Sequence, residues 1–422
     1  MIRSTSRLMS ILVGTMLVAG CGLGTQLPAP GTPGAVEVAA SAKKGDRYKV
    51  AQTFKSKHWA KLERVSSTYD RFPVERSRPN GRHIDPEIVA AFGTETPASR
   101  DVVLHYAAGW DQGEGTPVLL VHGSILDATS EWIAPHGKEG LVKTLTEKGQ
   151  RVFAVTFAHR HGDNLLWAEQ IANAIARIKD VTGAKQVDVV AHSKGTVAAR
   201  AYASGVKSSW GQAYRGDIRK LVLLGGPHLG IDFAFRHPVV NLGLYPEKKE
   251  TLFNAPMTWT KMLAFGVWTD TSEYTLMRSH GDYFPGQAQM LYRWDKTYPL
   301  PKHEQDWYTT YHGGQGFISV SPGIDKAIAE GGDFIDKLRA RPLDKRIALA
   351  SLAGNQATMK NILNEKTGPS DGVVFVKSAT HTEDMTKGGA KLLANETLPL
   401  NHMELVYAPT AKAWIVDQLQ KP

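Results

Sequence analysis

Between residues 102 and 228 the chain alternates short apolar runs with longer stretches in which apolar residues recur every three or four positions. The first pattern predicts buried strands and the second predicts amphipathic helices. The expected strands are Val102–Tyr106, Val118–Val121, Arg151–Phe157, Gln186–Val190 and Leu221–Leu224. Helices are expected at Gly137–Glu147, after Asp163 as N-cap, and after Gly195. Strands that alternate with helices form a mostly parallel sheet covered on both faces.

This regular pattern is interrupted in the second half of the chain. Prolines, glycines and aromatic residues recur over residues 229–345, so we interpret this region as a cap or lid inserted over the sheet edge. Within it, the apolar residues of Thr258–Trp268 predict one side of a short helix. Residues 346–422 return to the core pattern, with a strand at Arg346–Leu352 and a last helix at Thr410–Leu419. The core is therefore expected in two parts, 102–228 and 346–422.

The N-terminus has the pattern of a targeting segment. Residues 1–20 combine Arg3 and Arg7 with a short apolar run, which is typical of a signal peptide. The run ends in Leu-Val-Ala-Gly before Cys21, and this sequence resembles the bacterial lipobox, so Cys21 is the predicted lipidation site. Residues 21–44 are rich in Gly, Pro, Ala and Thr without periodicity and are interpreted as a flexible tether.

The segment between the tether and the first core strand is polar and mixed. We interpret residues 45–101 as an N-terminal extension that packs on the main domain, with a possible helix at Val50–Ser66. The whole chain has 422 residues, 42% hydrophobic, which suffices for a large domain with a cap. Its formal charge of +9 is not concentrated in a Lys/Arg stripe with interleaved aromatic residues, so nucleic-acid binding is not expected.

A candidate nucleophile stands between an expected strand and an expected helix, in Ala191-His192-Ser193-Lys194-Gly195. Small residues two positions on either side let the strand and helix backbones approach closely. A serine in this setting is held at a sharp, strained turn with its hydroxyl exposed. Ala191 stands where glycine is commoner, and one methyl group is tolerable. Ser193 is therefore the predicted nucleophile.

A serine hydroxyl becomes reactive when a base takes its proton and a carboxylate orients that base. In enzymes with this turn, the acid and the base follow the nucleophile along the chain. Beyond Leu343 the candidate bases are His381, in a polar loop, and His402, between an apolar segment and the last helix; we choose His402. Asp371, in an Asp-Gly turn, is the chosen acid, and Asp384 is the alternative.

The oxyanion of an acyl-transfer reaction needs two backbone N–H groups. We expect one from Lys194, directly after the nucleophile, and the other from Ser124, which follows His122-Gly123 at a strand end. The side chains do not matter for this task, so a lysine is compatible with it. We interpret His122 and His192 as hydrogen-bonded structural residues.

Five stretches carry a resemblance to a known family: Val118–Gly123, Val189–Gly195, Gly226–Gly230, Asp371–Val374 and Asn401-His402. They resemble the bacterial lipases and esterases of the α/β-hydrolase superfamily, with similarity to class 2 lipases. The resemblance covers roughly Val102–Gly230 and Arg346–Leu419. It implies the α/β-hydrolase fold: a mostly parallel sheet with helices on both faces and an inserted cap or lid.

The same resemblance implies a function. It indicates a triacylglycerol lipase or esterase that cleaves carboxylic esters of apolar acyl groups through an acyl-enzyme, with Ser193, Asp371 and His402 as triad. It implies no organic cofactor. The charge of Lys194 would be unusual beside an apolar substrate. Some such lipases carry Ca²⁺ or Zn²⁺, and His159, His161 and Asp163 lie close in sequence, but spacing alone is weak and we predict no metal.

Two other functions stay open. One is a depolymerase of polyesters such as polyhydroxyalkanoate, or an amidase, on the same fold. The other is a non-catalytic surface lipoprotein that keeps the fold for binding. The expected partners are an ester or lipid substrate and a membrane, held through the lipid anchor. The expected location is the bacterial cell envelope after export, and the sequence predicts no oligomeric state.

Overall fold

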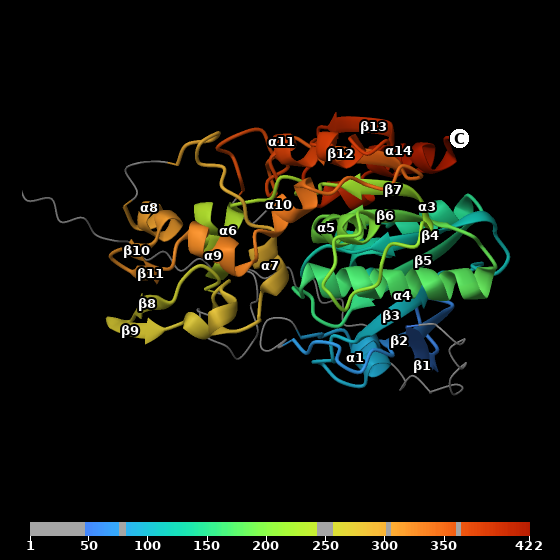
Figure 1. The fold of residues 1–422 in the computed structure, drawn as a ribbon, viewed down its shortest axis with the longest axis horizontal. Helices are drawn as coiled ribbons and strands as arrows, with labels where there is room; N and C mark the ends of the chain where they lie inside the picture. Colours follow the sequence, from blue (N-terminus) through green and yellow to red (C-terminus); the bar gives the residue numbers. More distant parts are fainter. Residues whose placement is uncertain (1–46, 76–81, 243–255, 301–304, 360–363) are drawn as a thin grey trace, which may run out of the picture. The chain divides into compact units, whose positions relative to one another are not determined.

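The computed structural model describes residues 47–75, 82–242, 256–300, 305–359 and 364–422. Its main sheet has nine strands in the order β1-β2-β3-β5-β4-β6-β7-β12-β13 (Figure 1). The six strands from β5 to β13 are parallel, and β1, β2 and β3 add an antiparallel edge. The predicted signal peptide, Cys21 and the tether lie outside the described residues.

The five core strands predicted between residues 102 and 228 are confirmed, with somewhat longer bounds. They are β3 (Asp101–Tyr106), β4 (Glu114–Val121), β5 (Gln150–Phe157), β6 (Val187–His192) and β7 (Ile218–Leu224). Every residue of β6 is buried, because helices cover both faces of the sheet and leave no side of this strand to water. The predicted fold class is confirmed by this mostly parallel sheet.

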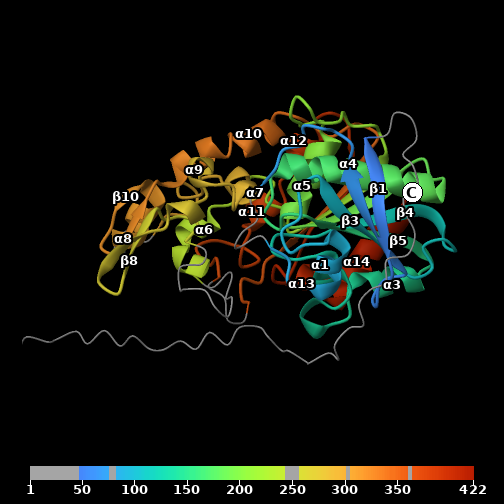
Figure 2. The ribbon, with the colours of Figure 1, turned by 90° about the horizontal axis from the view of Figure 1, so that it is seen from below.

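Helices lie on both faces of the sheet. The helices that follow the core strands are α2 (Ala128–Trp132), α3 (Leu141–Glu147), α4 (Asn164–Thr182) and α5 (Lys194–Ala203), with a short 3-10 turn, η1, at Pro135–Gly137. Helices α4 and α5 pack on one face and share its core cluster, whereas α3 and the C-terminal helices pack on the other (Figure 2). Asp163 caps α4 as predicted, since its side chain accepts a hydrogen bond from the Leu165 N–H.

The N-terminal extension is part of the sheet, and the predicted helix at Val50–Ser66 is wrong. This region forms β1 (Tyr48–Phe54) and β2 (Lys61–Ser67), and helix α1 (Pro86–Phe92) follows. Strand β2 pairs with β3, so the backbone hydrogen bonds come from a neighbouring strand rather than from a helical turn. The strands were not recognised because the alternation of apolar and polar residues is only weakly developed in this polar segment.

Most elements of the cap are short and pack around an apolar cluster of their own, whereas α10 (Phe334–Arg339) joins the core cluster on the α4–α5 side of the sheet. Its other helices are α6 (Phe233–Arg236), α7 (Pro285–Gln289), α8 (Gln305–His312) and α9 (Ile324–Glu330), with 3-10 turns η2 (Pro238–Leu242), η3 (Ser272–Tyr274) and η4 (Arg278–His280). Its small antiparallel sheet has the order β10-β11-β8-β9, formed by Gly314–Gln315, Ser319–Ser321, Lys261–Ala264 and Val267–Asp270. In Figure 1 these elements lie beyond the ends of the core strands.

The predicted short helix at Thr258–Trp268 is wrong. Strands β8 and β9 form a hairpin there, joined by Phe265 and Gly266, whose φ angles of 51° and 80° are left-handed. Two consecutive left-handed residues make the tight turn that connects twisted antiparallel strands and cannot continue a right-handed helix. The aromatic residues that suggested one helical side are therefore distributed over the hairpin, with Trp259 before β8, Phe265 in the turn and Trp268 in β9.

The C-terminal part completes the parallel sheet. It contains β12 (Ala348–Gly354), α11 (Val376–Ala379), α12 (Glu383–Thr386), β13 (Lys391–Leu398), α13 (Glu404–Tyr407) and α14 (Pro409–Gln420). The predicted β12 and α14 are confirmed, but β13 was not predicted. It is the exposed edge strand and has no regular alternation of buried and exposed residues. In the described part of the chain, no helix has the length and apolar character needed to span a membrane.

Candidate active site

Ser193 lies at the turn between β6 and α5, with φ 51° and ψ −126°. This backbone conformation is strained for a residue with a side chain, so the predicted sharp turn is present. Gly195 makes the turn possible, because a Cβ there would lie 2.5 Å from the carbonyl oxygen of His122 and 2.8 Å from that of Val121. Ala191 is fully buried, which agrees with the expectation that its methyl group is tolerated.

His402 lies in the loop after β13, and its Nε2 is 2.9 Å from Ser193 Oγ. The loop is fixed from two sides. Its His402 N–H donates to the carbonyl of Asp371 at 2.9 Å, and Asn401 Oδ1 accepts the N–H groups of Met403 and Glu404. The structure therefore brings the predicted base to the predicted nucleophile, 209 positions away in sequence.

Asp371 is fully buried, and its Oδ2 lies 2.7 Å from His402 Nδ1. The other carboxylate oxygen, Oδ1, accepts hydrogen bonds from the N–H groups of Val373 at 3.0 Å and Val374 at 2.8 Å. These bonds hold the carboxylate in the orientation in which it faces the imidazole. Gly372 permits the turn through its φ of 100°.

The alternative acid and base lie together elsewhere. Asp384 Oδ2 is 2.8 Å from His381 Nε2 and also accepts a hydrogen bond from Arg339 Nε at 3.1 Å. This cluster is half-buried beside α10 and α12. Asp384 is therefore engaged with His381 and Arg339, whereas Asp371 contacts the base.

Of the two predicted oxyanion donors, Lys194 directly follows Ser193 in the chain, and Ser124 follows Gly123, on which a Cβ would lie 3.0 Å from Ser193 Cβ. Lys194 is the first residue of α5, so its N–H has no acceptor within the helix. In the other loop, the Gly123 N–H donates to Glu131 Oε2 and the Ile125 N–H to the Arg160 carbonyl. The Ser124 N–H lies between these two engaged groups.

The side chain of Ser124 ties this loop to the cap. Gln287 of α7 donates a hydrogen bond from Nε2 to Ser124 Oγ at 2.9 Å. Gln287 was not predicted as a site residue, because it lies in the irregular cap region, where no motif indicates it. A similar omission is Glu131 of α2, a helix of only five residues with no motif around it.

The Lys194 side chain lies in the interior. It is fully buried, and its Nζ is 3.1 Å from the ring centroid of Trp167 in α4. Among the described residues Nζ has no hydrogen-bond partner. Burial lowers the pKa of Lys194 well below its usual range, against the attraction of Glu75 and Asp163. The amine that would be unusual beside an apolar substrate is therefore packed on Trp167, and the backbone N–H of Lys194 is the group that directly follows Ser193.

His122 and His192 are hydrogen-bonded in the interior, as predicted. His122 Nδ1 donates to the Gly123 carbonyl at 2.6 Å, and its Nε2 accepts the Phe157 N–H at 3.3 Å. Burial lowers the pKa of His122 to about 3, so this ring is neutral. His192 contacts Glu131 and the carbonyl of His402.

The three residues considered for a metal are engaged with protein groups. The His161 N–H donates to His159 Nδ1 at 3.0 Å, and Gln287 Nε2 lies 3.1 Å from His161 Nδ1. Asp163 pairs with Arg278 of the cap. Over the residues that the structure describes, no group of three or more His, Cys, Asp and Glu side chains has an arrangement suited to a metal ion.

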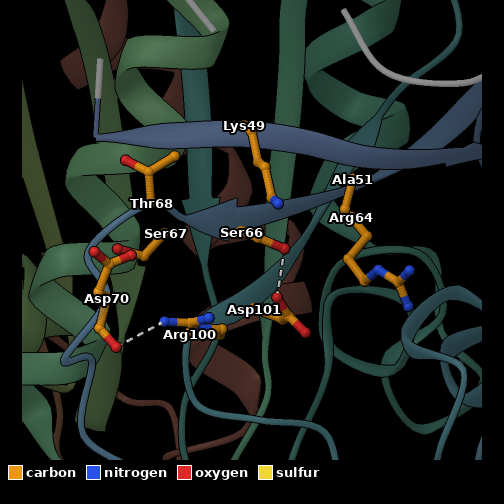
Figure 3. A pocket seen from close by; sticks show the side chains of 9 residues that line it. All are labelled: Lys49, Ala51, Arg64, Ser66, Ser67, Thr68, Asp70, Arg100 and Asp101. Atoms are coloured by element: carbon orange, nitrogen blue, oxygen red, sulfur yellow. Dashed lines mark hydrogen bonds between the residues drawn. The ribbon is translucent and has the colours of Figure 1, made fainter. Parts of the chain in front are cut away.

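A polar cavity of about 440 Å³ lies elsewhere, on the antiparallel edge formed by β1, β2 and β3 (Figure 3). Lys49 extends over this cavity, and Ser66 Oγ donates to Asp101 Oδ1 on its floor. None of the predicted site residues lines it. The strand ends, rather than this cavity, therefore carry the candidate active site.

The fold and this side-chain arrangement define an α/β-hydrolase. Residues 115–233, which contain the Ser193 turn, match the model of the family described as Lipase (class 2). The predicted resemblance to bacterial lipases and esterases of this superfamily is thereby confirmed over the matched residues.

Solved structures of several bacterial proteins are similar to this chain. The mature lipase BlEst2 of Bacillus licheniformis has 12% identity and a TM-score of 0.42, over 75% of this chain and 97% of that one. The lin2722 product of Listeria innocua has 17% identity and a TM-score of 0.38, over 73% and 95%. Est1E of Butyrivibrio proteoclasticus has 12% identity and a TM-score of 0.35, over 76% and 96%.

Proposed function

We propose that this protein is a serine hydrolase that cleaves carboxylic esters of apolar acyl groups through an acyl-enzyme. The observation that carries the proposal is the continuous contact from Ser193 Oγ through His402 to Asp371, with distances of 2.9 Å and 2.7 Å. A serine hydroxyl alone is a weak nucleophile, and this arrangement supplies the base and its orienting carboxylate.

In the first half-reaction, Ser193 Oγ attacks the ester carbonyl while His402 Nε2 takes its proton. Asp371 holds the imidazole and stabilises its positive charge. The N–H groups of Ser124 and Lys194 stabilise the oxyanion of the tetrahedral intermediate. His402 then gives the proton to the alkoxide oxygen, and the alcohol leaves.

In the second half-reaction, water attacks the acyl-enzyme. His402 accepts a proton from the water molecule, and the resulting tetrahedral intermediate collapses to release the carboxylic acid. His402 returns its proton to Ser193 Oγ, so the enzyme is regenerated.

Two features support an apolar acyl group. The matched family is one of lipases, and the Lys194 amine is buried against Trp167. The cap also exposes apolar side chains at the ends of two hairpins, where a lipid aggregate could be contacted: Leu263, Phe265, Val267, Trp268, Phe317 and Ile318. A rise in activity above the solubility limit of the substrate would support contact of this cap with a lipid–water interface.

The Ser193→Ala variant tests the serine mechanism. It should lose esterase activity by a factor of about 10⁴ or more, because the nucleophile is absent. A fluorophosphonate should label the wild-type protein at Ser193 and leave the variant unlabelled. Unaltered ester hydrolysis by Ser193→Ala would contradict the mechanism, and an unlabelled, inactive wild type would favour a non-catalytic lipoprotein.

The acyl group and the leaving group are tested by a substrate series. Nitrophenyl esters of increasing chain length, triolein, a polyhydroxyalkanoate film and matched amides separate a lipase from a depolymerase or an amidase. We expect the highest kcat/KM for an ester with an apolar acyl chain. Preferential release of soluble products from the film would favour the polyester alternative.

We also propose that the enzyme is exported and anchored in the cell envelope through a lipid on Cys21. The support is the sequence pattern around this residue. Metabolic labelling with a radioactive fatty acid, followed by membrane fractionation, tests it.

A further inference from the structure

A second carboxylate–imidazole pair lies beside the triad, and the mechanism above does not use it. His192 Nδ1 is 3.0 Å from Glu131 Oε1, and both side chains are almost completely excluded from solvent. A buried pair of this kind is unfavourable unless its polar atoms find partners. The partners of Glu131 and His192 therefore indicate what the pair does.

Both side chains reach a loop of the candidate active site. Glu131 Oε2 accepts a hydrogen bond from the Gly123 N–H at 2.9 Å. His192 Nε2 donates to the carbonyl oxygen of His402 at 3.1 Å. The hydrogen bond between Nδ1 and Oε1 joins these two contacts. The result is an unbroken chain of hydrogen bonds from Gly123 to His402.

These two loops must keep their positions relative to Ser193. Gly123 precedes Ser124, the predicted oxyanion donor, and a Cβ on Gly123 would lie 3.0 Å from Ser193 Cβ. The His192 and His402 rings have centroids 4.7 Å apart. Because Glu131 holds the Gly123 N–H, it sets the orientation of the peptide that immediately precedes the Ser124 peptide.

We propose that Glu131 and His192 are positioning residues that hold the oxyanion loop and the His402 loop in register with the nucleophile. The inference rests on the proposed serine mechanism and adds to it two residues that do not touch substrate. They act through Ser124 and His402. Removing their hydrogen bonds should therefore lower kcat more than it raises KM.

Two substitutions at one position separate hydrogen bonding from charge. In Glu131→Gln, the amide oxygen can accept the Gly123 N–H while the amide NH₂ donates to His192 Nδ1, so every link is kept without charge. In Glu131→Met, the Gly123 N–H and His192 lose their partner at similar side-chain volume. We expect kcat to fall about 100-fold in Glu131→Met and less than about 5-fold in Glu131→Gln, with KM within about 3-fold of wild type in both.

The matched control is Glu139→Met, at an exposed glutamate near the start of α3. Its kcat and KM should equal those of wild type. His192→Phe removes the middle of the hydrogen-bond chain, and the double variant with Glu131→Met should be no slower than the slower single variant. Such non-additivity is expected when two residues act as one unit.

All rates are measured per folded molecule at low temperature, with folding followed by near-ultraviolet circular dichroism. If Glu131→Met does not fold, His192→Phe and Glu131→Gln carry the test. Wild-type kcat in folded Glu131→Met or His192→Phe would overturn the proposal, as would a raised KM with unchanged kcat. Failure of the serine mechanism is seen separately, in an unlabelled wild type or an active Ser193→Ala variant.

Discussion

At the scale of single residues, the candidate site separates the roles of backbone and side chain. Lys194 illustrates this, since its N–H adjoins the nucleophile while its amine packs on Trp167. The motif around Ser193 could be predicted because its steric requirements are local. The direction of the Lys194 side chain could not, because it depends on α4 and α7, which are distant in sequence.

Lys194→Met should keep the activity and raise the stability. Burial lowers the pKa of Lys194 in the folded state, whereas the unfolded chain binds the proton with a pKa of about 10.4. The lysine therefore opposes folding below that pH, and the penalty increases as pH falls towards the folded pKa. We expect Lys194→Met to gain about 1–3 kcal/mol of unfolding free energy at pH 7 and less at pH 9.5.

Urea unfolding at the two pH values measures this gain. Lys143→Met, at an exposed lysine of α3, is the matched control and should show no comparable gain. The kcat of Lys194→Met should stay within about 3-fold of wild type, because only the backbone N–H stabilises the oxyanion. A loss of 100-fold or more would mean that the amine takes part in the reaction.

At the scale of elements, strands that are buried on both faces could be predicted from the sequence, and partly exposed strands could not. Strands such as β6 are buried on both faces and have a continuous apolar run, so they could be recognised from the sequence. Strands β1, β2 and β13 lie at or near the sheet edges, and their polar, half-exposed residues carry a weak signal. Their positions follow from pairing with distant strands, which no local pattern encodes.

The β8–β9 hairpin differs from the prediction for a more specific reason. Phe265 occupies a left-handed turn position and is 95% exposed, so neither its conformation nor its burial follows the usual preference of a phenylalanine. In the sequence, the spacing of Phe265 and the aromatic residues near it therefore matches that of the buried side of a helix. Glu131 is the converse case, a buried carboxylate whose partners Gly123 and His192 come from two separate segments.

Phe265→Asn should stabilise the hairpin. Asparagine tolerates the left-handed conformation, and Asn-Gly is the preferred pair at a tight turn of this kind. We expect a gain of about 0.5–1.5 kcal/mol in unfolding free energy, measured by urea denaturation. Phe265→Ala is the control, because it removes the ring and keeps the strained backbone. An equal gain in both variants would assign the effect to the exposed ring.

At the scale of the whole molecule, buried neutral histidines make stability depend on pH. Burial is the main cause that lowers the pKa values of His83, His105 and His122 to about 3. As pH falls below about 6.5, the unfolded chain binds protons at these positions and the folded chain does not. Each histidine therefore removes up to about 1.4 kcal/mol of stability per pH unit between about pH 6.5 and pH 3.

Glu75 acts in the opposite direction. Burial, assisted by Asp163, raises the pKa of Glu75 to about 8, so its contribution to stability increases as pH falls from 8 towards 4.5. One such carboxyl offsets one of the three histidines. Together these groups predict a steep loss of stability on acidification. We therefore expect unfolding of the whole molecule, rather than a change at the triad, to end the activity at low pH.

His105→Gln isolates one contribution far from the reaction. His105 Nε2 contacts Thr156 Oγ1 at 2.8 Å, and glutamine keeps a polar group there. Urea unfolding at pH 6.5 and pH 5 should show that wild type loses about 1.6 kcal/mol more than His105→Gln over this interval. His58→Gln, at an exposed histidine, should match wild type. If the stability of His105→Gln falls as steeply as that of wild type, His105 is not the residue that binds a proton on unfolding.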